Sequence, residues 1–350
     1  MPREKKIQNS QPRPADPQAA PGEEQLFTSL RPESLDEYIG QAQVVEPLKI
    51  AMEAARRRGE PLDHVLLYGP PGLGKTTLSH IIRREMGTDL VLTSGPALKI
   101  AGDLLGYVSS LKYGDVFFID EIHRLDPKVE ERLYSAMEDF KVDLVVDRGL
   151  NARTLQYTLK QFTLVGATTM AGMLSAPLRD RFGLVYHLQF YSPQELQRII
   201  TRSAAILEVP IEPDGAFEIA RRSRGTPRIA NRLLRRVRDY AQVKSDGTIT
   251  RRLADEALRL EGIDDQGLDA LDRRLLSVIA TVYKGGPVGI EALGATLNEQ
   301  ASTLVETVEP YLLQIGFLAR TPTGRRITDE GLVHLGLQPP HRGPQPQLGL

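Results

Sequence analysis

The pattern of apolar and polar positions changes twice along the 350-residue chain. Between residues 26 and 191, short apolar runs alternate with amphipathic stretches of helical period. The runs with the length of buried strands are His64–Tyr68, Leu90–Thr93, Val116–Ile119, Val142–Val146 and Phe162–Gly166. Strands that alternate with helices predict an α/β layer built on a largely parallel sheet.

From residue 192 the pattern becomes helical. Ser192-Pro193 followed by Glu195 is typical of a helix start, because it combines an N-cap serine, a proline in the first turn and an acid at the third helical position. Further helices are predicted to begin at Asp214 and at Pro227. This region is therefore interpreted as a small helical domain.

A third region follows an acidic, glycine-containing stretch at residues 261–265, which is interpreted as a linker. Three helical segments come first, and two short strands then flank the turn Thr321–Gly324. These segments are Leu271–Tyr283, Ile290–Leu297, Ala301–Ile315, Phe317–Arg320 and Arg325–Thr328. Three helices followed by a hairpin indicate a winged helix.

The boundaries predicted from these changes define three domains and two terminal segments. The domains are a large α/β domain at residues 26–191, a small helical domain at 192–262 and a winged helix at 263–337. Residues 1–25 are predicted to be a disordered, proline-rich leader, and residues 338–350 a flexible tail.

Composition narrows the class of protein. A hydrophobic content of 41% and a charged content of 25% are those of an ordinary soluble globular protein. The absence of cysteine excludes disulfides, thiolate zinc sites and a thiol nucleophile. No membrane-length apolar run and no secretory signal are found, so a cytoplasmic protein without a membrane partner is expected. The net charge of −1 argues against a positive coat for nucleic acid.

The strongest motif is Gly69–Thr77, which reads GPPGLGKTT. It matches the P-loop pattern between an apolar strand and a helix, where glycines let backbone N–H groups surround phosphate oxygens. Lys75 is expected to bridge the β- and γ-phosphates of a nucleotide, and Thr76 to give its hydroxyl to Mg²⁺.

The strand Val116–Ile119 ends in Asp120-Glu121. Two carboxylates at the carboxyl end of a buried strand are the expected partners of a P-loop. Asp120 is predicted to hold Mg²⁺ through its water shell, and Glu121 to polarise the attacking water. His123 lies next along the chain, and a structural role is expected for it, since a lone histidine is more often structural.

Three further polar positions are candidates for phosphate chemistry. Thr168-Thr169 end a third strand, from which a polar side chain would reach between the γ-phosphate and the water, or would simply cap the strand. Arg181 of Arg179-Asp180-Arg181 could neutralise charge on a transferred phosphoryl group, although such pairs are usually surface features. Arg228 sits in the first turn of a helix, where its charge opposes the helix dipole, which suggests an anionic partner.

Taken in order, these motifs resemble the AAA+ ATPases and, within them, the RuvB family, the bacterial motors of Holliday-junction branch migration. The signature comprises the P-loop, Asp-Glu-Ile-His at 120–123, Gly-Ala-Thr-Thr at 166–169, Arg-Asp-Arg-Phe-Gly at 179–183 and Gly-Thr-Pro-Arg at 225–228. It covers the chain from about residue 26 to residue 338. The expected fold class is thus α/β, an AAA+ P-loop domain with a helical lid domain and a C-terminal winged-helix domain.

The resemblance assigns roles to individual residues. Thr168 matches sensor 1, Arg228 matches sensor 2, and Arg181 matches the arginine finger that enters a neighbouring subunit's site. The resemblance implies ATP and Mg²⁺ as cofactors. The residues it places at the nucleotide are Leu30, Arg31, Gly72, Gly74, Lys75, Thr76, Thr77, Glu138, Asp139, Phe140, Arg181, Tyr191 and Arg228.

Two partner surfaces are also implied. A hairpin over residues 142–159 corresponds to the one that docks on the junction-binding protein RuvA, although burial of one strand face explains its pattern equally well. Arg320 and Arg325 on the wing match DNA-contacting positions, and Arg326 flanks the same turn. Residues 263–338 carry ten acidic and six basic side chains, so positive charge in this domain is concentrated at the hairpin.

The function expected from the resemblance is an ATP hydrolase that pulls duplex DNA through a homohexameric ring during recombination and repair. RuvA and the resolvase RuvC are the implied protein partners. Two alternatives stay open from the residues: a clamp-loader-like or helicase-loading ATPase, and a nucleotide-switched DNA-binding regulator. An intact Glu121 disfavours the regulator, because a switch can dispense with fast hydrolysis.

Overall fold

The computed structural model describes residues 29–145 and 154–339. It contains two compact units, which are treated separately. The P-loop unit comprises residues 21–208 and 225–231, and the C-terminal unit comprises residues 209–224 and 232–350. The predicted leader at residues 1–25 and nearly all of the predicted tail lie outside the described residues, as do residues 146–153.

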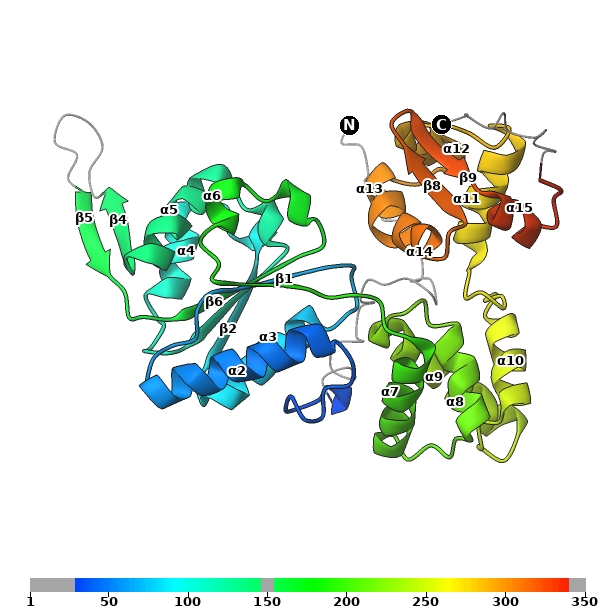
Figure 1. The fold of residues 1–350 in the computed structure, drawn as a ribbon, viewed down its shortest axis with the longest axis horizontal. Helices are drawn as coiled ribbons and strands as arrows, with labels where there is room; N and C mark the ends of the chain where they lie inside the picture. The colour runs from blue at the N-terminus through cyan, green and yellow to red at the C-terminus, as the bar shows by residue number, and fades with distance from the viewer. Residues whose placement is uncertain (1–28, 146–153, 340–350) are drawn as a thin grey trace, which may run out of the picture. The chain divides into compact units, whose positions relative to one another are not determined.

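A five-stranded sheet forms the centre of the P-loop unit (Figure 1). The strand order is β2-β3-β6-β1-β7, and every neighbouring pair is parallel. The strands are β1 (Val65–Tyr68), β2 (Leu90–Ser94), β3 (Val116–Asp120), β6 (Thr163–Thr168) and β7 (Leu184–His187). The predicted parallel α/β layer is therefore confirmed.

Helices cover both faces of this sheet (Figure 1). Figure 1 shows α2 and α3 below the sheet and α4, α5 and α6 above it. Their bounds are α2 (Ala42–Arg58), α3 (Lys75–Met86), α4 (Ala101–Val108), α5 (Pro127–Glu138) and α6 (Ala176–Arg179). Leu104 of α4, Leu133 of α5 and Phe117 of β3 share one apolar core with Leu164 of β6. Helices on both faces explain why β6 is buried along its whole length and β3 up to its last residue, Asp120.

β7 is absent from the apolar runs that predict the other strands. It lies at an edge of the sheet, and its residues alternate between partly buried and exposed. The run at residues 142–146 belongs to a separate hairpin, in which β4 (Lys141–Val145) pairs antiparallel with β5 (Thr154–Thr158). The predicted pairing of these two segments is confirmed, and the turn between them lies outside the described residues.

Helix α7 (Pro193–Ile206) completes the P-loop unit. Its start has the predicted capping box, in which Ser192 Oγ accepts from the Glu195 N–H and the Glu195 carboxylate accepts from the Ser192 N–H. Helix α9 (Pro227–Lys244) begins in this unit and continues in the C-terminal unit.

The C-terminal unit joins helices of the small domain to the winged helix. Its helices are α8 (Pro213–Arg221), α10 (Arg251–Leu260), α11 (Ala270–Thr281), α12 (Ile290–Leu297), α13 (Ala301–Thr303), α14 (Glu309–Gln314) and α15 (Asp329–His334). A π-helical turn, Leu304–Val308, connects α13 to α14. The wing strands β8 (Leu318–Thr321) and β9 (Gly324–Ile327) pair antiparallel. The predicted order of helices and hairpin is confirmed.

Residues 261–265, interpreted from sequence as a linker, are held in place. Asp265 binds Arg222, which is fully buried at the end of α8, and Asp264 pairs with His334 of α15. Nearby, buried Arg224 pairs with buried Asp272 of α11. Ion pairs thus cross the predicted boundary between lid and winged helix. In the parts of the chain that the structure describes, no helix has both the length and the apolar character for crossing a membrane.

Candidate nucleotide site

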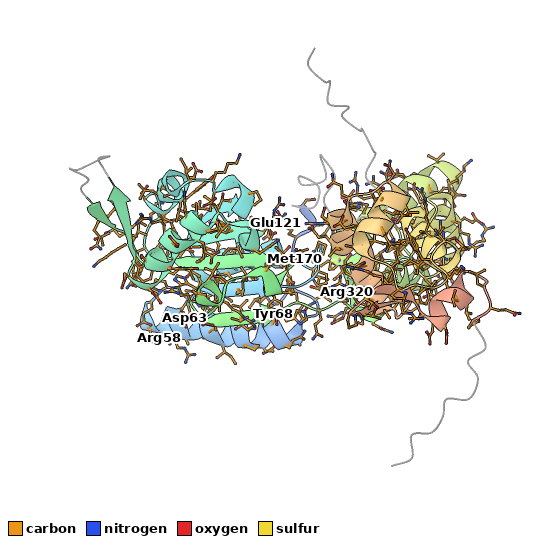
Figure 2. The ribbon with its side chains drawn as sticks, turned by 90° about the horizontal axis from the view of Figure 1, so that it is seen from above. Arg58, Asp63, Tyr68, Glu121, Met170 and Arg320 are labelled. Carbon is orange, nitrogen blue, oxygen red and sulfur yellow. The ribbon has the colours of Figure 1, made fainter. Side chains whose placement is uncertain are left out.

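Four of the predicted catalytic residues, Lys75, Asp120, Glu121 and Thr168, lie at or shortly after the carboxyl ends of the strands. Because β1, β3 and β6 are parallel, their carboxyl ends meet at one edge. In Figure 2, Tyr68, Glu121 and Met170 lie at the same end of the P-loop unit, and Asp63, which precedes β1, lies at the opposite end.

The P-loop between β1 and α3 has a backbone that only glycine fits. Gly69 has φ 142° and Gly74 has φ 100°, in the region that favours glycine. A Cβ at Gly74 would lie 2.7 Å from the Tyr38 hydroxyl, and one at Gly69 would overlap the Leu188 carbonyl oxygen. The loop therefore leads into the N-terminus of α3 with its amides unobstructed by side chains, as phosphate binding requires.

Lys75, the first residue of α3, is buried, with 8% of its surface exposed. Its Nζ donates hydrogen bonds to the carbonyl oxygens of Gly69, at 2.7 Å, and Pro70, at 2.9 Å. Burial lowers the Lys75 pKa to about 8; the charge of Arg228 acts in the same direction and that of Asp120 opposes it. The ammonium group is thus short of compensating charge, as expected for a group that binds a phosphate. Thr76 and Thr77 follow in the same helical turn, both partly buried.

Asp120 and Glu121 stand where β3 ends. The Asp120 Oδ1 accepts a hydrogen bond from the Glu121 N–H at 2.9 Å, and Glu121 has a left-handed φ of 47°. The Glu121 carboxylate pairs with Arg124, with 2.9 Å between Oε2 and Nη1. The chain turns here into a 3-10 helix, η2 (Ile122–Arg124).

Thr168 ends β6 with 1% of its surface exposed. Its Oγ1 lies 2.9 Å from Nδ1 of His123 and accepts the Met170 N–H at 2.9 Å. Burial lowers the pKa of His123, so that the ring is neutral near neutral pH. Thr168 was a candidate from sequence, and a structural role was expected for His123, which lies two residues after Glu121. Because the two residues are 45 positions apart, no local pattern predicts their contact.

The turn that carries Arg228 lies against the P-loop. The Arg228 N–H donates to the Gly72 carbonyl at 3.4 Å, and the Tyr191 N–H donates to the Gly225 carbonyl at 2.8 Å. Gly225 itself has room only for hydrogen, since a Cβ would lie 2.8 Å from Phe190 Cβ. Arg228, far from the P-loop in sequence, therefore joins the same site.

Tyr191, one of the residues predicted to contact the nucleotide, lies against the same loop. Tyr191 and Tyr38 are buried, their hydroxyl oxygens lie 3.0 Å apart, and each is within hydrogen-bond range of the Leu73 carbonyl. Burial raises the pKa of Tyr38 to about 12 and that of Tyr191 well above its usual value. Tyr38 was not singled out from sequence, where nothing distinguishes it from a core aromatic residue.

The N-terminal segment of the described chain carries Leu30 and Arg31, which the resemblance places at the adenine end of the nucleotide. The Leu30 carbonyl accepts a hydrogen bond from Arg202 Nη1 at 2.9 Å, and Arg31 Nη1 lies 3.1 Å from His80 Nε2 on α3. These contacts attach the segment to α7 and to the helix that follows the P-loop.

Arg181 has a separate set of partners. Its guanidinium donates to the Pro177 carbonyl at 2.7 Å and pairs with Glu138 at 3.0 Å, and it lies over the Tyr134 ring, 4.4 Å from the centroid. Glu138 and Asp139 are exposed at the end of α5. Phe140, the next residue, instead packs on Phe162 in the core, with ring centroids 5.8 Å apart.

The wing carries the predicted DNA-contacting residues. Arg320 and Arg325 are cross-strand partners on β8 and β9, and both bind the carboxylate of Glu309, which is fully buried. The Arg320 side chain is 50% exposed and that of Arg325 only 16%. Arg326 is exposed on the other face of β9 and has no ion-pair partner among the described residues.

The P-loop cluster fits a magnesium nucleotide. Glycine backbone, a buried lysine and a second cation can hold phosphates, and an aspartate and a threonine are oxygen ligands suited to Mg²⁺, which usually takes only one or two protein ligands. No group of three or more His, Asp or Glu side chains among the described residues could hold a metal by itself.

Three family models match consecutive parts of the chain. The Holliday junction DNA helicase RuvB P-loop domain matches residues 30–188, the RuvB AAA lid domain matches 191–264, and the RuvB C-terminal winged helix domain matches 265–336. The large domain is accordingly an AAA+ P-loop ATPase domain.

Solved structures of two relatives agree with the family models. The Thermotoga maritima RuvB Holliday junction branch migration motor is 52% identical, with a TM-score of 0.82 over 89% of this chain and 100% of that chain. A mutant of Thermotoga maritima RuvB gives 52% identity and a TM-score of 0.83 over 89% of this chain and 99% of that chain. With three matching domain models and this identity over nearly all of its relatives' length, the chain belongs to the RuvB family.

Proposed function

We propose that this chain is an ATP-driven motor that moves duplex DNA at Holliday junctions during branch migration. The observation that carries the proposal is the assembly of Lys75, Asp120, Thr168 and Arg228 around one P-loop in a chain of the RuvB family. We also propose a cytoplasmic location and three domains with boundaries at residues 26–191, 192–262 and 263–337, between a leader and a tail.

Each residue of the P-loop site has a proposed role in ATP hydrolysis. Lys75 exchanges its carbonyl partners for the β- and γ-phosphates, with Gly72, Gly74 and Thr77 lining the phosphates. Thr76 and Asp120 hold Mg²⁺, which neutralises charge on the phosphates when bound. Glu121 polarises the attacking water, and the Thr168 hydroxyl reaches between the γ-phosphate and that water.

Two further groups connect the nucleotide to the rest of the chain. Arg228 brings a cation from the start of α9 to the phosphates, so nucleotide loss would alter the position of α9. Leu30 and Arg31 line the adenine end of the nucleotide, and Tyr191 is a further contact to it. The hydrogen bonds of Tyr191 support this role. Its hydroxyl binds the Leu73 carbonyl of the P-loop, and its N–H binds the Gly225 carbonyl in the turn that precedes α9.

We propose that the site is completed by a second copy in a homohexameric ring. Arg181 acts as the arginine finger in the neighbouring subunit's site. Its ion pair with exposed Glu138 supports a position for both residues at the interface between subunits. We propose that Asp139 and Phe140 also lie near the nucleotide. The ring of Phe140 packs against the core of its own domain, so only its backbone would be available to contact a nucleotide.

Partner contacts are proposed at two hairpins. The β4–β5 hairpin, residues 142–159, is the proposed docking site for the RuvA tetramer. Tyr157, 44% exposed, supports it, whereas Val142 and Leu159 are buried in the core. Arg320 and Arg325 of the wing are the proposed contacts to DNA phosphates, and the resolvase RuvC is a proposed partner of the wider complex.

A strand-exchange assay on a synthetic four-way junction tests this function. With RuvA present, we expect loss of the four-way structure with ATP and Mg²⁺ but not with a non-hydrolysable ATP analogue. Nucleotide-dependent DNA binding without strand exchange would instead indicate a regulator, and ATPase activity stimulated by a primed template but not by a junction would indicate a loader.

A further inference from the structure

The imidazole of His123 joins the ends of two strands of the sheet. It lies in η2, three residues after Asp120 of β3, and its Nδ1 is 2.9 Å from the Thr168 hydroxyl at the end of β6. Lys75, Asp120 and Glu121 are all close enough to influence its charge. His123 is thus inside the cluster of candidate catalytic residues and not merely next to it in sequence.

A glycine allows η2 to approach β6 closely. A Cβ added at Gly166 would lie 3.0 Å from Cδ1 of Ile122 and 2.9 Å from Cζ of Phe182. Gly166 and Thr168 are two residues apart, so they share a face of β6. The fully buried Ile122 side chain packs against this face at Gly166, and the residue after it, His123, is thereby seated at Thr168.

The backbone after β3 is also held in the shape that this approach requires. Glu121 adopts the left-handed region, which residues with a side chain rarely occupy, and Asp120 Oδ1 accepts its N–H. The conformation turns the chain back over the sheet edge directly after the two carboxylates.

The hydrogen-bonding capacity of Thr168 is well used in this arrangement. A hydroxyl has one donor and two acceptor positions, and the Met170 N–H occupies one acceptor position. The pair with Nδ1 forms in either neutral tautomer: the hydroxyl donates when the ring proton is on Nε2, and accepts when it is on Nδ1. His123 therefore restricts the rotation of the hydroxyl about its own bond.

We propose that His123 is a positioning residue for ATP hydrolysis, which fixes the Thr168 hydroxyl and ties the end of β6 to the Asp120-Glu121 end of β3. This rests on the proposed ATPase function of the same site. The role differs from that of His64, whose ring binds the Leu164 N–H and the Met137 carbonyl at the amino end of the sheet.

Steady-state ATPase assays of the full-length protein with ATP and Mg²⁺ test the proposal. His123→Leu is expected to lower kcat on the order of tenfold, the effect of one lost hydrogen bond at its upper range, with KM within about twofold of wild type. His123→Asn is expected to restore most of kcat, because the amide places a polar atom near the position of Nδ1. Loss of rescue by Asn, or an effect on KM alone, would overturn the proposal.

A double-mutant cycle identifies the partner. Thr168→Val should lower kcat to a similar extent, and His123→Leu combined with Thr168→Val should be no slower than the worse single variant. Additive effects would show that His123 acts without Thr168 and would refute the proposal.

His64→Leu is the matched control for a structural histidine. It should lower the melting temperature and leave kcat per folded molecule unchanged, whereas His123→Leu should lower kcat in protein that melts normally. If His123→Leu follows the His64→Leu pattern, its role is structural and the proposal is wrong. If the wild-type protein itself lacks ATPase activity, the proposed function fails instead, which distinguishes the two failures.

Discussion

The P-loop site and the wing hairpin both gather cations for phosphates, but they balance the charges differently. Lys75 is buried against backbone carbonyls and has no ion pair among the described residues, and its pKa is lowered to about 8 by burial. On the wing, Arg320 and Arg325 share the buried carboxylate of Glu309.

The difference indicates that the two sites bind phosphate with different strengths. A buried cation that lacks a counter-charge gains much from an arriving phosphate, which suits a site that must hold and cleave one nucleotide. Arginines already paired with a carboxylate gain less from each DNA phosphate. A translocating motor benefits from such contacts, because it must release DNA as often as it binds.

The largest effect is expected from removing the uncompensated cation. Lys75→Ala should abolish measurable ATP binding and lower turnover by a hundredfold or more, on the order found for groups that stabilise transferred phosphoryl charge. Calorimetry with Mg-ATP and a phosphate-release assay would measure both. Lys112→Ala, which removes an exposed lysine paired with Asp89, is the control and should resemble wild type. If Lys75→Ala kept its affinity for ATP, the uncompensated charge of Lys75 would not be what holds the nucleotide.

Arg181→Ala should keep ATP binding and reduce turnover on the order of a thousandfold, as for other arginine fingers. Arg179→Ala removes an exposed arginine two residues away and is expected to have little effect. Mixing Arg181→Ala with Asp120→Asn subunits should restore activity at sites that combine an intact Asp120 with a neighbour's Arg181. Absence of any such rescue would argue that Arg181 acts within its own subunit.

Glu309→Gln tests the balance of charge on the wing. The change leaves two arginines without their buried counter-charge, so it should destabilise the winged helix by about 3 kcal/mol, the lower end for breaking a buried ion pair. Chemical denaturation would give this value, with Glu306→Gln, a partly buried residue of the preceding turn, as the control. An unchanged stability would mean that the arginines do not depend on Glu309.

The smallest effects on binding and turnover are expected from the wing arginines, whose loss is measured by DNA affinity and not by stability. Replacing Arg320 and Arg325 together by Ala should reduce the slope of log K against log salt for duplex DNA by about two, since each phosphate contact contributes about 0.9. Basal ATPase should not change. Arg326→Ala should lower the slope by no more than about one, and exposed Arg274 on α11 provides the control. An unaltered slope in the double variant would remove the wing from the DNA interface.

Much of the fold could be predicted from sequence because its signals are local. Apolar runs predicted β1, β2, β3 and β6 to within about two residues at each end, and the capping residues predicted the start of α7. β7 escaped prediction since an edge strand needs no continuous apolar run. The stretch at 261–265 had the composition of a linker, but Asp265 forms an ion pair with buried Arg222, and Asp264 Oδ2 lies 3.0 Å from Nε2 of His334.

By itself, the sequence determined the P-loop that leads into Lys75 and the strand ends that carry Asp120 and Thr168, because strand length, glycine spacing and motif order are properties of neighbouring residues. Only the tertiary structure decided which of these groups touch. The bond of His123 to Thr168, the turn of Arg228 on the P-loop, the Tyr38–Tyr191 pair and the hold of Glu309 on two wing arginines all join residues distant in sequence or on facing elements. Such contacts depend on how closely packed elements approach one another, and features such as the missing side chain of Gly166 set that distance.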